Sequence, residues 1–150
     1  MSKNIRLILT FILIIIAVLA WRFFFYVPSS KFVDIKINDT NYKIELAQTP
    51  TQKIKGLSKR DSLCSTCGML FVFDSETQLP FWMKDTLIPL DIIWLDKNGK
   101  IVSNKTAEIN SQKIYQNESP AQYVLELNAN DYQKLNLKIG KIIQLPNFNE

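Results

Sequence analysis

The sequence predicts a mainly β fold, a β-sandwich or partly open barrel of about eight short strands with one or two short helices, preceded by an N-terminal transmembrane helix. Three observations carry this prediction. Apolar and polar residues alternate with a period of two in several segments, turn residues separate short apolar runs, and one long charge-free run lies near the N-terminus.

The N-terminal segment differs in composition from the rest of the 150 residues. Leu7–Trp21 contains no charge, and the apolar run resumes after Arg22, so that residues 7–27 would span about 31 Å as a helix. Lys3 and Arg6 precede the run and place the N-terminus in the cytoplasm. We therefore expect residues 1–27 to be a single-pass membrane anchor, 28–32 a linker, and 33–146 an extracytoplasmic β domain. The alternative is a signal peptide cleaved after Ala20, which would leave the domain secreted.

The domain begins with a predicted hairpin followed by a short helix. Apolar residues alternate with polar ones in Val33–Ile37 and Tyr42–Leu46, on either side of a polar turn. Thr49 followed by Pro50 is typical of a helix start, and we expect about ten helical residues that bring Ile54 and Leu57 onto one face.

The later strands are predicted from apolar runs between turns. They are Gly68–Phe73, Phe81–Met83, Leu90–Leu95, a return strand from Ile101, Tyr123–Leu127 and Lys141–Leu145. Asn98-Gly99 between two of these runs is a strong hairpin signal. A helical turn is expected near Asp131–Leu135.

Charge and composition exclude several functions. The formal charge is +4, but Lys3, Arg6 and Arg22 belong to the anchor, which leaves the domain with 15 basic and 14 acidic residues. This near-neutral domain lacks the basic stripe that nucleic-acid binding needs. The chain has no histidine, which excludes histidine catalysis and histidine-ligated metals. We predict no metal and no cofactor.

Cys64 and Cys67 form a C-x-x-C pair for which several interpretations stand. Outside the cytoplasm, two thiols at this spacing favour a local disulfide. A thioredoxin-like redox site would instead need a surrounding βαβ unit, which the sequence pattern does not indicate. Half of a zinc or iron–sulfur site completed by a second chain, or free thiols, are further alternatives.

The segment Phe81–Asp91 holds charged residues in apolar surroundings. Asp91 interrupts a run that otherwise reads as a buried strand, so its carboxylate needs partners. Asp91 and Lys84 could line a pocket beside Trp82, which could stack on a sugar or another flat ligand. Alternatively, Asp91 accepts hydrogen bonds from the backbone of the turn Thr86–Pro89.

Three motifs carry a family resemblance: GLSKR at 56–60, GMLFVF at 68–73 and FWMKDTLIPLDIIWLD at 81–96. From about Val33 to Leu145, the chain resembles the domain of unknown function 192 family. This is an uncharacterised, UPF0127-like family of conserved bacterial and archaeal membrane or secreted proteins. The resemblance implies a mainly β, exported domain and no enzyme class. The cysteine pair lies outside the general pattern of the family.

The ligand-binding candidates are Arg60, Trp82, Lys84, Asp91 and Glu126. The four polar residues, Arg60, Lys84, Asp91 and Glu126, either converge on one polar site beside Trp82 or each close a turn or ion pair of their own. We expect a binding or scaffolding module of the cell envelope, with an envelope ligand or protein as partner and no catalytic residues. The alternatives are a hydrolase that uses Asp91 and Glu126, with Lys84 or Arg60 as electrostatic partner, on an envelope glycan or peptide, and a dithiol redox protein.

Overall fold

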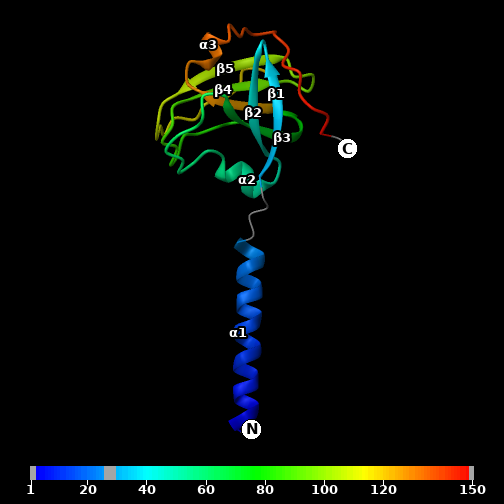
Figure 1. Cartoon of the computed structure of the whole chain (residues 1–150), viewed down its shortest axis with the longest axis vertical. Helices are drawn as coiled ribbons and strands as arrows, with labels where there is room; N and C mark the ends of the chain where they lie inside the picture. The colour runs from blue at the N-terminus through cyan, green and yellow to red at the C-terminus, as the bar shows by residue number, and fades with distance from the viewer. Residues whose placement is uncertain (1–2, 26–29, 149–150) are drawn as a thin grey trace.

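The computed structural model describes residues 3–25 and 30–148. Their central feature is one six-stranded mixed sheet with the strand order β1-β2-β3-β6-β4-β5 (Figure 1). The strands are β1 (Lys31–Ile37), β2 (Thr40–Ala47), β3 (Cys67–Thr77), β4 (Leu90–Leu95), β5 (Ile101–Ala107) and β6 (Ala121–Asn128). The helices are α1 (Lys3–Phe25), α2 (Pro50–Lys55) and α3 (Asp131–Lys134).

Both predicted hairpins are confirmed. β1 pairs antiparallel with β2 up to Ile37 opposite Thr40, and Asn38 takes the left-handed conformation in the turn, with φ of 54°. β4 pairs antiparallel with β5, and Gly99 in their turn has φ of 76°. Asparagine and glycine tolerate these positive φ angles better than other residues, which is why both turns can be recognised in the sequence.

β2 and β3 are parallel and are joined through α2, an arrangement that the sequence analysis did not predict. α2 begins where expected, with Thr49 and Gln52 forming a reciprocal capping box before and within its first turn. It has six residues rather than about ten, because Gly56 leaves the helical conformation with φ of 48° and ψ of −137°. The expected shared face is wrong: Leu57 is buried, whereas Ile54 is 83% exposed.

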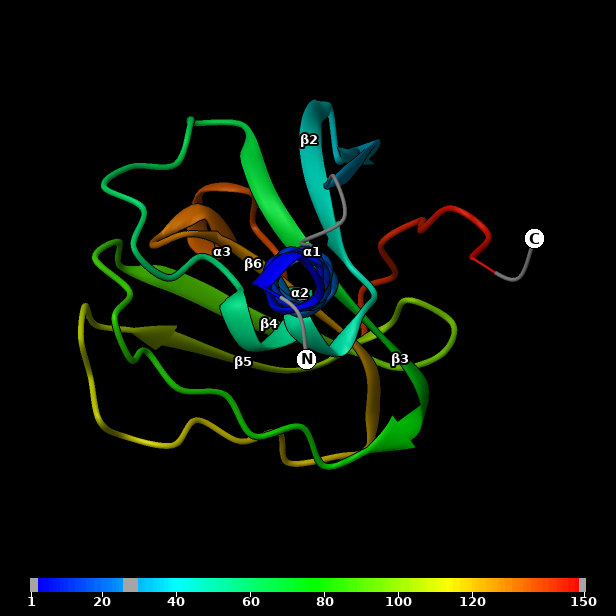
Figure 2. The same cartoon turned by 90° about the horizontal axis from the view of Figure 1, so that it is seen from below.

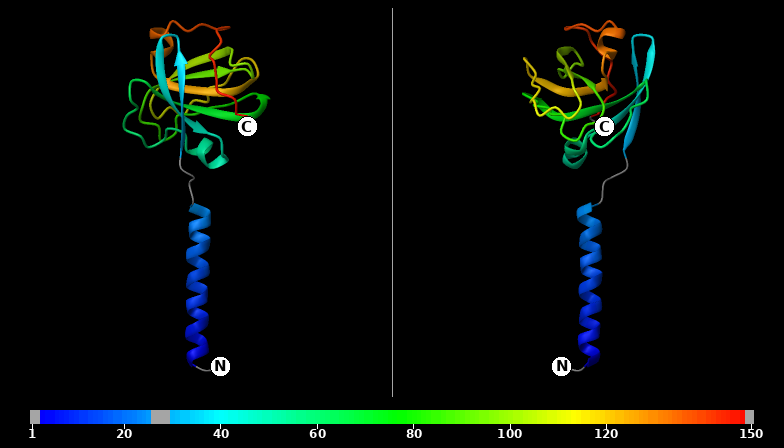
Figure 3. Two further views of the ribbon diagram at one scale, coloured as in Figure 1. Left: turned by 45° about the vertical axis from the view of Figure 1, so that its right-hand side comes forward. Right: turned by 90° about the vertical axis from the view of Figure 1, so that its left-hand side faces the viewer.

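Both faces of the sheet are covered. Along β4, Leu90, Ile92 and Trp94 belong to one core cluster, and Ile93 and Leu95 belong to a second. We call these two sides of the sheet the Trp94 face and the Ile93 face. Loop side chains cover the Trp94 face (Leu57, Leu79, Met83, Ile88 and Tyr115). The second cluster contains residues of both edge strands, β1 and β5, because the sheet curves (Figure 3).

Two predicted strands are wrong. Residues 81–83 contribute only an isolated bridge, from Phe81 to Tyr115, and residues 141–145 contribute only one, from Ile142 to Lys100. The mainly β class is confirmed, but the described strands form one sheet of six rather than about eight strands, so the fold is not a sandwich of two sheets. The helical turn near 131–135 is confirmed as α3.

The N-terminal helix α1 has 23 residues and stands apart from the sheet (Figures 1 and 3). Across the described part of the chain, no helix has both the length and the apolar character needed to cross a membrane. The predicted transmembrane helix is therefore not supported. Two residues of the expected linker 28–32, residues 28 and 29, lie outside the described residues.

Candidate functional site

Two loops build the candidate site at the margin of the Trp94 face. One loop joins β3 to β4 (residues 78–89) and the other joins β5 to β6 (108–120), and they run along the same side of the sheet (Figure 2). Phe81 and Tyr115 exchange backbone hydrogen bonds, both of 2.8 Å. The Asn110 amide donates to the Thr86 carbonyl at 2.9 Å. The two loops are thus fixed to each other.

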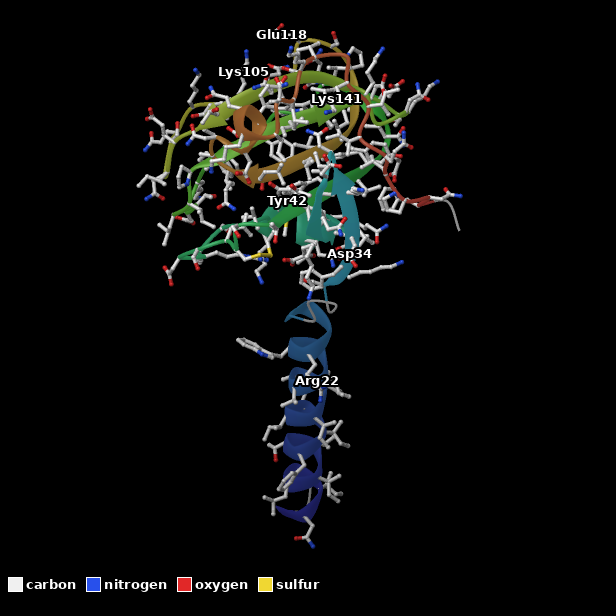
Figure 4. The ribbon with its side chains drawn as sticks, turned by 45° about the horizontal axis from the view of Figure 1, so that its top comes forward. Arg22, Asp34, Tyr42, Lys105, Glu118 and Lys141 are labelled. Atoms are coloured by element: carbon white, nitrogen blue, oxygen red, sulfur yellow. A yellow bond between two sulfur atoms is a disulfide. The ribbon has the colours of Figure 1, made fainter. Side chains whose placement is uncertain are left out.

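Ion pairing and a buried amide fix the second loop further. Lys105 of β5 and Glu118 of the loop, both labelled in Figure 4, are 3.0 Å apart. The buried Asn117 side chain accepts from the Leu79 amide at 2.7 Å and donates to the Thr77 carbonyl at 3.1 Å. Since a buried polar side chain with satisfied partners holds its surroundings in one arrangement, Asn117 fixes the loop 108–120 to the end of β3 and to the start of the loop 78–89.

An open pocket of about 600 Å³ lies between these loops. It is lined by Trp82, Lys84, Asp85, Asn110, Ser111, Gln112 and Ile114. The indole of Trp82 is 56% exposed, and the Lys84 ammonium lies 5.4 Å from the centre of its ring. We call this cavity the outer pocket. It offers an aromatic surface beside hydrogen-bonding groups of both charges.

A turn in an unusual backbone conformation supports the outer pocket. Lys59 and Asp85 have φ of 59° and 56°, and the Lys59 amide donates to the Asp85 carbonyl at 2.7 Å. Positive φ is costly for lysine, and such residues concentrate at functional sites. The turn at residues 56–60 is therefore joined to the loop 78–89 by a hydrogen bond between two residues in the left-handed conformation.

A smaller cavity of about 50 Å³ adjoins the outer pocket, with Trp82 and Lys84 lining both. Its inner wall includes the carboxyl side chain of Glu126, which is 4% exposed. We call it the inner cavity. Leu57, Phe71 and Phe81 provide apolar wall, and Lys53, Lys55 and Thr86 are among its polar lining residues.

Strand register explains how Glu126 reaches this cavity. Glu126 of β6 lies opposite Met69 of β3 and Ile92 of β4, and Met69 lies opposite Glu45 of β2. Directly opposed residues share a face, so all four point to the Trp94 face. Two glutamates thus flank Met69 there.

The two glutamates have different surroundings. The Arg60 guanidinium is 2.8 Å from a Glu45 carboxylate oxygen, and Ser30 donates to the other oxygen. Among the described residues, no donor hydrogen bonds to the Glu126 carboxyl group. Burial raises the pKa of Glu126 to about 8, although the nearby charge of Arg60 acts to lower it. Glu126 is therefore largely protonated at neutral pH.

Asp91 does not belong to this site. It lies opposite Leu127, one position from the pair of Ile92 with Glu126, and therefore points to the Ile93 face. Its carboxylate accepts from the Thr106 hydroxyl at 2.7 Å and from the Tyr132 amide at 2.8 Å. The interpretation that it binds the Thr86–Pro89 backbone is thus wrong about the partners. Of the five candidates, Trp82, Lys84 and Glu126 line the cavities, and Arg60 acts on Glu126 from outside the lining.

The second wall of the outer pocket was not predicted from the sequence. Asn110, Ser111, Gln112 and Ile114 have neither an apolar period nor a motif. Their role depends on which strands the loop connects, and that information is not local. The glutamate partner of Arg60 was also missed, because Glu45 alternates like any exposed strand residue.

Cys64 and Cys67 are joined by a disulfide, with their Cα atoms 5.0 Å apart. The bond closes the turn that leads into β3, where the Cys67 amide donates to the Cys64 carbonyl at 3.0 Å. The parallel unit β2–α2–β3 surrounds it, contrary to the expectation of no βαβ unit. The pair precedes a strand, however, whereas a thioredoxin-like site lies at the start of a helix.

Among the described residues, no group of three or more cysteine, aspartate or glutamate side chains is placed so that it could hold a metal ion.

The part of the chain that matches known proteins is the sheet domain. A family model described as "Uncharacterized ACR", domain of unknown function 192, matches residues 33–145. A UPF0127 protein of Thermococcus kodakarensis is 28% identical over 103 residues, which are 67% of this chain and 63% of that relative. The chain thus spans less than two thirds of the length of the relative.

Two crystal structures share the fold. One, from Sinorhizobium meliloti, is described as a candidate transcription regulator; it is 30% identical with a TM-score of 0.70, over 77% of this chain and 93% of that one. The other, from Novosphingobium aromaticivorans, has unknown function; it is 27% identical with a TM-score of 0.69, over 77% of this chain and 85% of that one.

Proposed function

Since the chain belongs to the domain of unknown function 192 family, whose members are uncharacterised, we propose from the geometry that it is a binding module with a small ligand in the outer pocket. The observation that carries this proposal is the pocket of about 600 Å³, walled by a half-exposed indole and by polar groups of two loops. Ligand sites commonly have about 300–1,000 Å³ and combine apolar walls with a few polar groups.

The chemistry of the wall favours a ring-shaped ligand. The Trp82 indole can stack on the apolar face of a sugar or on another flat group. Lys84, Asp85 and Asn110 offer donors and acceptors for the hydroxyl or amide groups at the rim of such a ring. An envelope glycan meets both requirements, and a peptide meets them only where one of its side chains carries a ring.

The hydrolase alternative loses its geometric support. It requires Asp91 and Glu126 to flank one cleft, about 5–10 Å apart. The sheet places them on opposite faces, and the Asp91 carboxylate is occupied by Thr106 and Tyr132. Nor does any contact of the described residues beyond the disulfide itself favour the dithiol alternative.

Replacing Trp82 by alanine tests the proposed pocket. We expect the full chain in mild detergent to bind at least one of three probes, chitotriose, cellotriose or trialanine, by isothermal titration calorimetry. Trp82→Ala should weaken that binding about tenfold, because stacking contributes roughly 1.4 kcal/mol.

Phe32 provides the matched control, because it is another half-exposed aromatic residue but lies on β1, outside the pocket lining. Phe32→Ala should bind like the unchanged chain. Equal affinity of Trp82→Ala and the unchanged chain, or no heat of binding with any probe, would contradict the proposal.

The proposal includes attachment to a membrane through residues 7–27, with the N-terminus cytoplasmic and the domain outside. It is supported by the charge-free run Leu7–Trp21 and by the exposure of these side chains in α1. We expect the chain to stay with the membrane fraction through an alkaline carbonate wash. The double variant Ile14→Lys, Ile15→Lys should be released, because each lysine opposes insertion by about 3 kcal/mol. Release of the unchanged full-length chain would show that the segment does not anchor it.

A further inference from the structure

The proposed function involves the outer pocket and not yet the inner cavity beside it. Glu126 is 4% exposed and lines this cavity, and no side-chain hydrogen bond joins its carboxyl group to another described residue. Because no buried side-chain oxygen or nitrogen of the described residues lacks a partner, the Glu126 carboxyl oxygens are accessible from the cavity and can bind a water molecule or a ligand group there. The cavity adjoins the outer pocket through Trp82 and Lys84.

The size of the inner cavity limits what can enter. Its volume of about 50 Å³ exceeds the roughly 15 Å³ that one water needs. It is an order of magnitude smaller than the outer pocket of about 600 Å³. A ligand ring would therefore stay against Trp82, and only a substituent of a few heavy atoms would reach Glu126.

The walls of the inner cavity select the chemistry of that substituent. Leu57, Phe71 and Phe81 form an apolar side that suits a methyl group. Lys84 and Glu126 form a polar side, where a protonated carboxyl donates a hydrogen bond to an oxygen acceptor. A methyl group and a carbonyl oxygen on adjacent atoms constitute an acetyl group.

Charges around Glu126 oppose a cationic substituent. Lys53 and Lys55 come from α2, Arg60 from the turn after it, and Lys84 from the loop 78–89. Glu45 of β2 also points to the Trp94 face, and its negative charge is paired with Arg60. An ammonium group would therefore meet several like charges and one acid that is neutral at pH 7.

We propose that the inner cavity binds the acetamido group of an N-acetylated sugar whose ring stacks on Trp82, with the acetyl oxygen against the Glu126 carboxyl group. This inference rests on the proposed function and assigns the ligand class of the same site. The acetyl methyl group packs on Leu57, Phe71 and Phe81, and the sugar hydroxyls face the polar rim of the outer pocket.

Three trisaccharides that differ only at the C2 substituent test this proposal. Chitotriose carries acetamido, cellotriose hydroxyl, and the deacetylated glucosamine trimer ammonium groups. We expect the full chain in mild detergent to bind chitotriose about 30-fold more tightly than cellotriose at pH 6.5, and the ammonium trimer least.

The pH dependence identifies the donor. Because burial raises the pKa of Glu126 to about 8, the carboxyl group is mostly protonated at pH 6.5 and can donate its O–H to the acetyl oxygen. At pH 9 it is mostly a carboxylate, which has no proton to donate and repels that oxygen. Chitotriose affinity should therefore fall about tenfold between pH 6.5 and pH 9. Glu126→Gln keeps the shape and an N–H donor, so its affinity should stay within a few-fold of the unchanged chain and be constant over the same range. The neighbouring lysines are the same in both proteins, so a fall in affinity that only the unchanged chain shows is due to Glu126.

Each unfavourable outcome has a defined meaning. Equal affinity for chitotriose and cellotriose, both dependent on Trp82, would overturn the inner-cavity assignment and leave the proposed function standing. An identical pH profile for Glu126→Gln and the unchanged chain would overturn the role of Glu126. Binding of trialanine alone would overturn the sugar class, and no binding of any probe would overturn both proposals.

Discussion

Gly99→Ala, which adds one methyl group in the β4–β5 turn, should lower the free energy of unfolding by about 4 kcal/mol. A Cβ atom at Gly99 would lie 2.3 Å from the backbone oxygen of Ile143, and the residue has φ of 76°. The C-terminal segment is docked there, because the Ile143 amide donates to the Gly99 carbonyl at 2.9 Å. Relief of the clash therefore requires the backbone to separate and this hydrogen bond to break. Urea unfolding of the full chain, followed by tryptophan fluorescence, measures the loss.

Gly140 separates the two causes of that loss. It also has positive φ, of 89°, but a Cβ atom there would meet nothing within 4 Å. Gly140→Ala should therefore cost only the conformational strain of an L-residue, about 1–2 kcal/mol. Equal losses in the two variants would show that the contact with Ile143 contributes nothing and that strain alone explains both effects.

The features predicted correctly from the sequence are those encoded by neighbouring residues. Asn38 and Asn98-Gly99 specify tight turns, and Thr49-Pro50 specifies the start of α2. The two false strands show the limit of this approach. Phe81–Met83 and Lys141–Leu145 have apolar strand-like composition, but they lie as loop and tail against the sheet with one bridge each, and they bury Met83 and Ile143 while Trp82 and Ile142 stay about half exposed. Tertiary packing, rather than local pattern, decides whether an apolar run pairs as a strand.

The candidate site shows a second limit, which is register. Asp91 and Glu126 lie on adjacent strands, and a difference of one position in pairing puts them on opposite faces. The alternation within β4 or β6 cannot reveal this, because both strands are buried on both sides. By contrast, Trp82 and Lys84 were identified because a charged residue in apolar surroundings beside a tryptophan is a local signal.

The same register makes Asp91 a structural residue with a testable contribution. Its carboxylate is fully buried and accepts from the Thr106 hydroxyl of β5 and from the Tyr132 amide in the first turn of α3. The side chain of Asn130, the N-cap residue of α3, makes no capping hydrogen bond. Asp91 therefore satisfies from the sheet a helix donor that would otherwise be buried without a partner.

Asp91→Ala should lower the free energy of unfolding by about 3 kcal/mol, because it removes two hydrogen bonds to a charged acceptor and leaves their donors unsatisfied. Asp91→Asn keeps one acceptor oxygen and should lose roughly half as much. Urea unfolding measures both losses, and amide hydrogen exchange at Tyr132 should become faster in Asp91→Ala. A double-mutant cycle with Thr106→Val isolates the hydroxyl contribution, which we expect to be about 1–2 kcal/mol. A fully stable Asp91→Ala would contradict this assignment. Because Asp91 points away from the Trp94 face, the folded variant should retain the ligand affinity of the outer pocket, whereas a residue of the binding site would not.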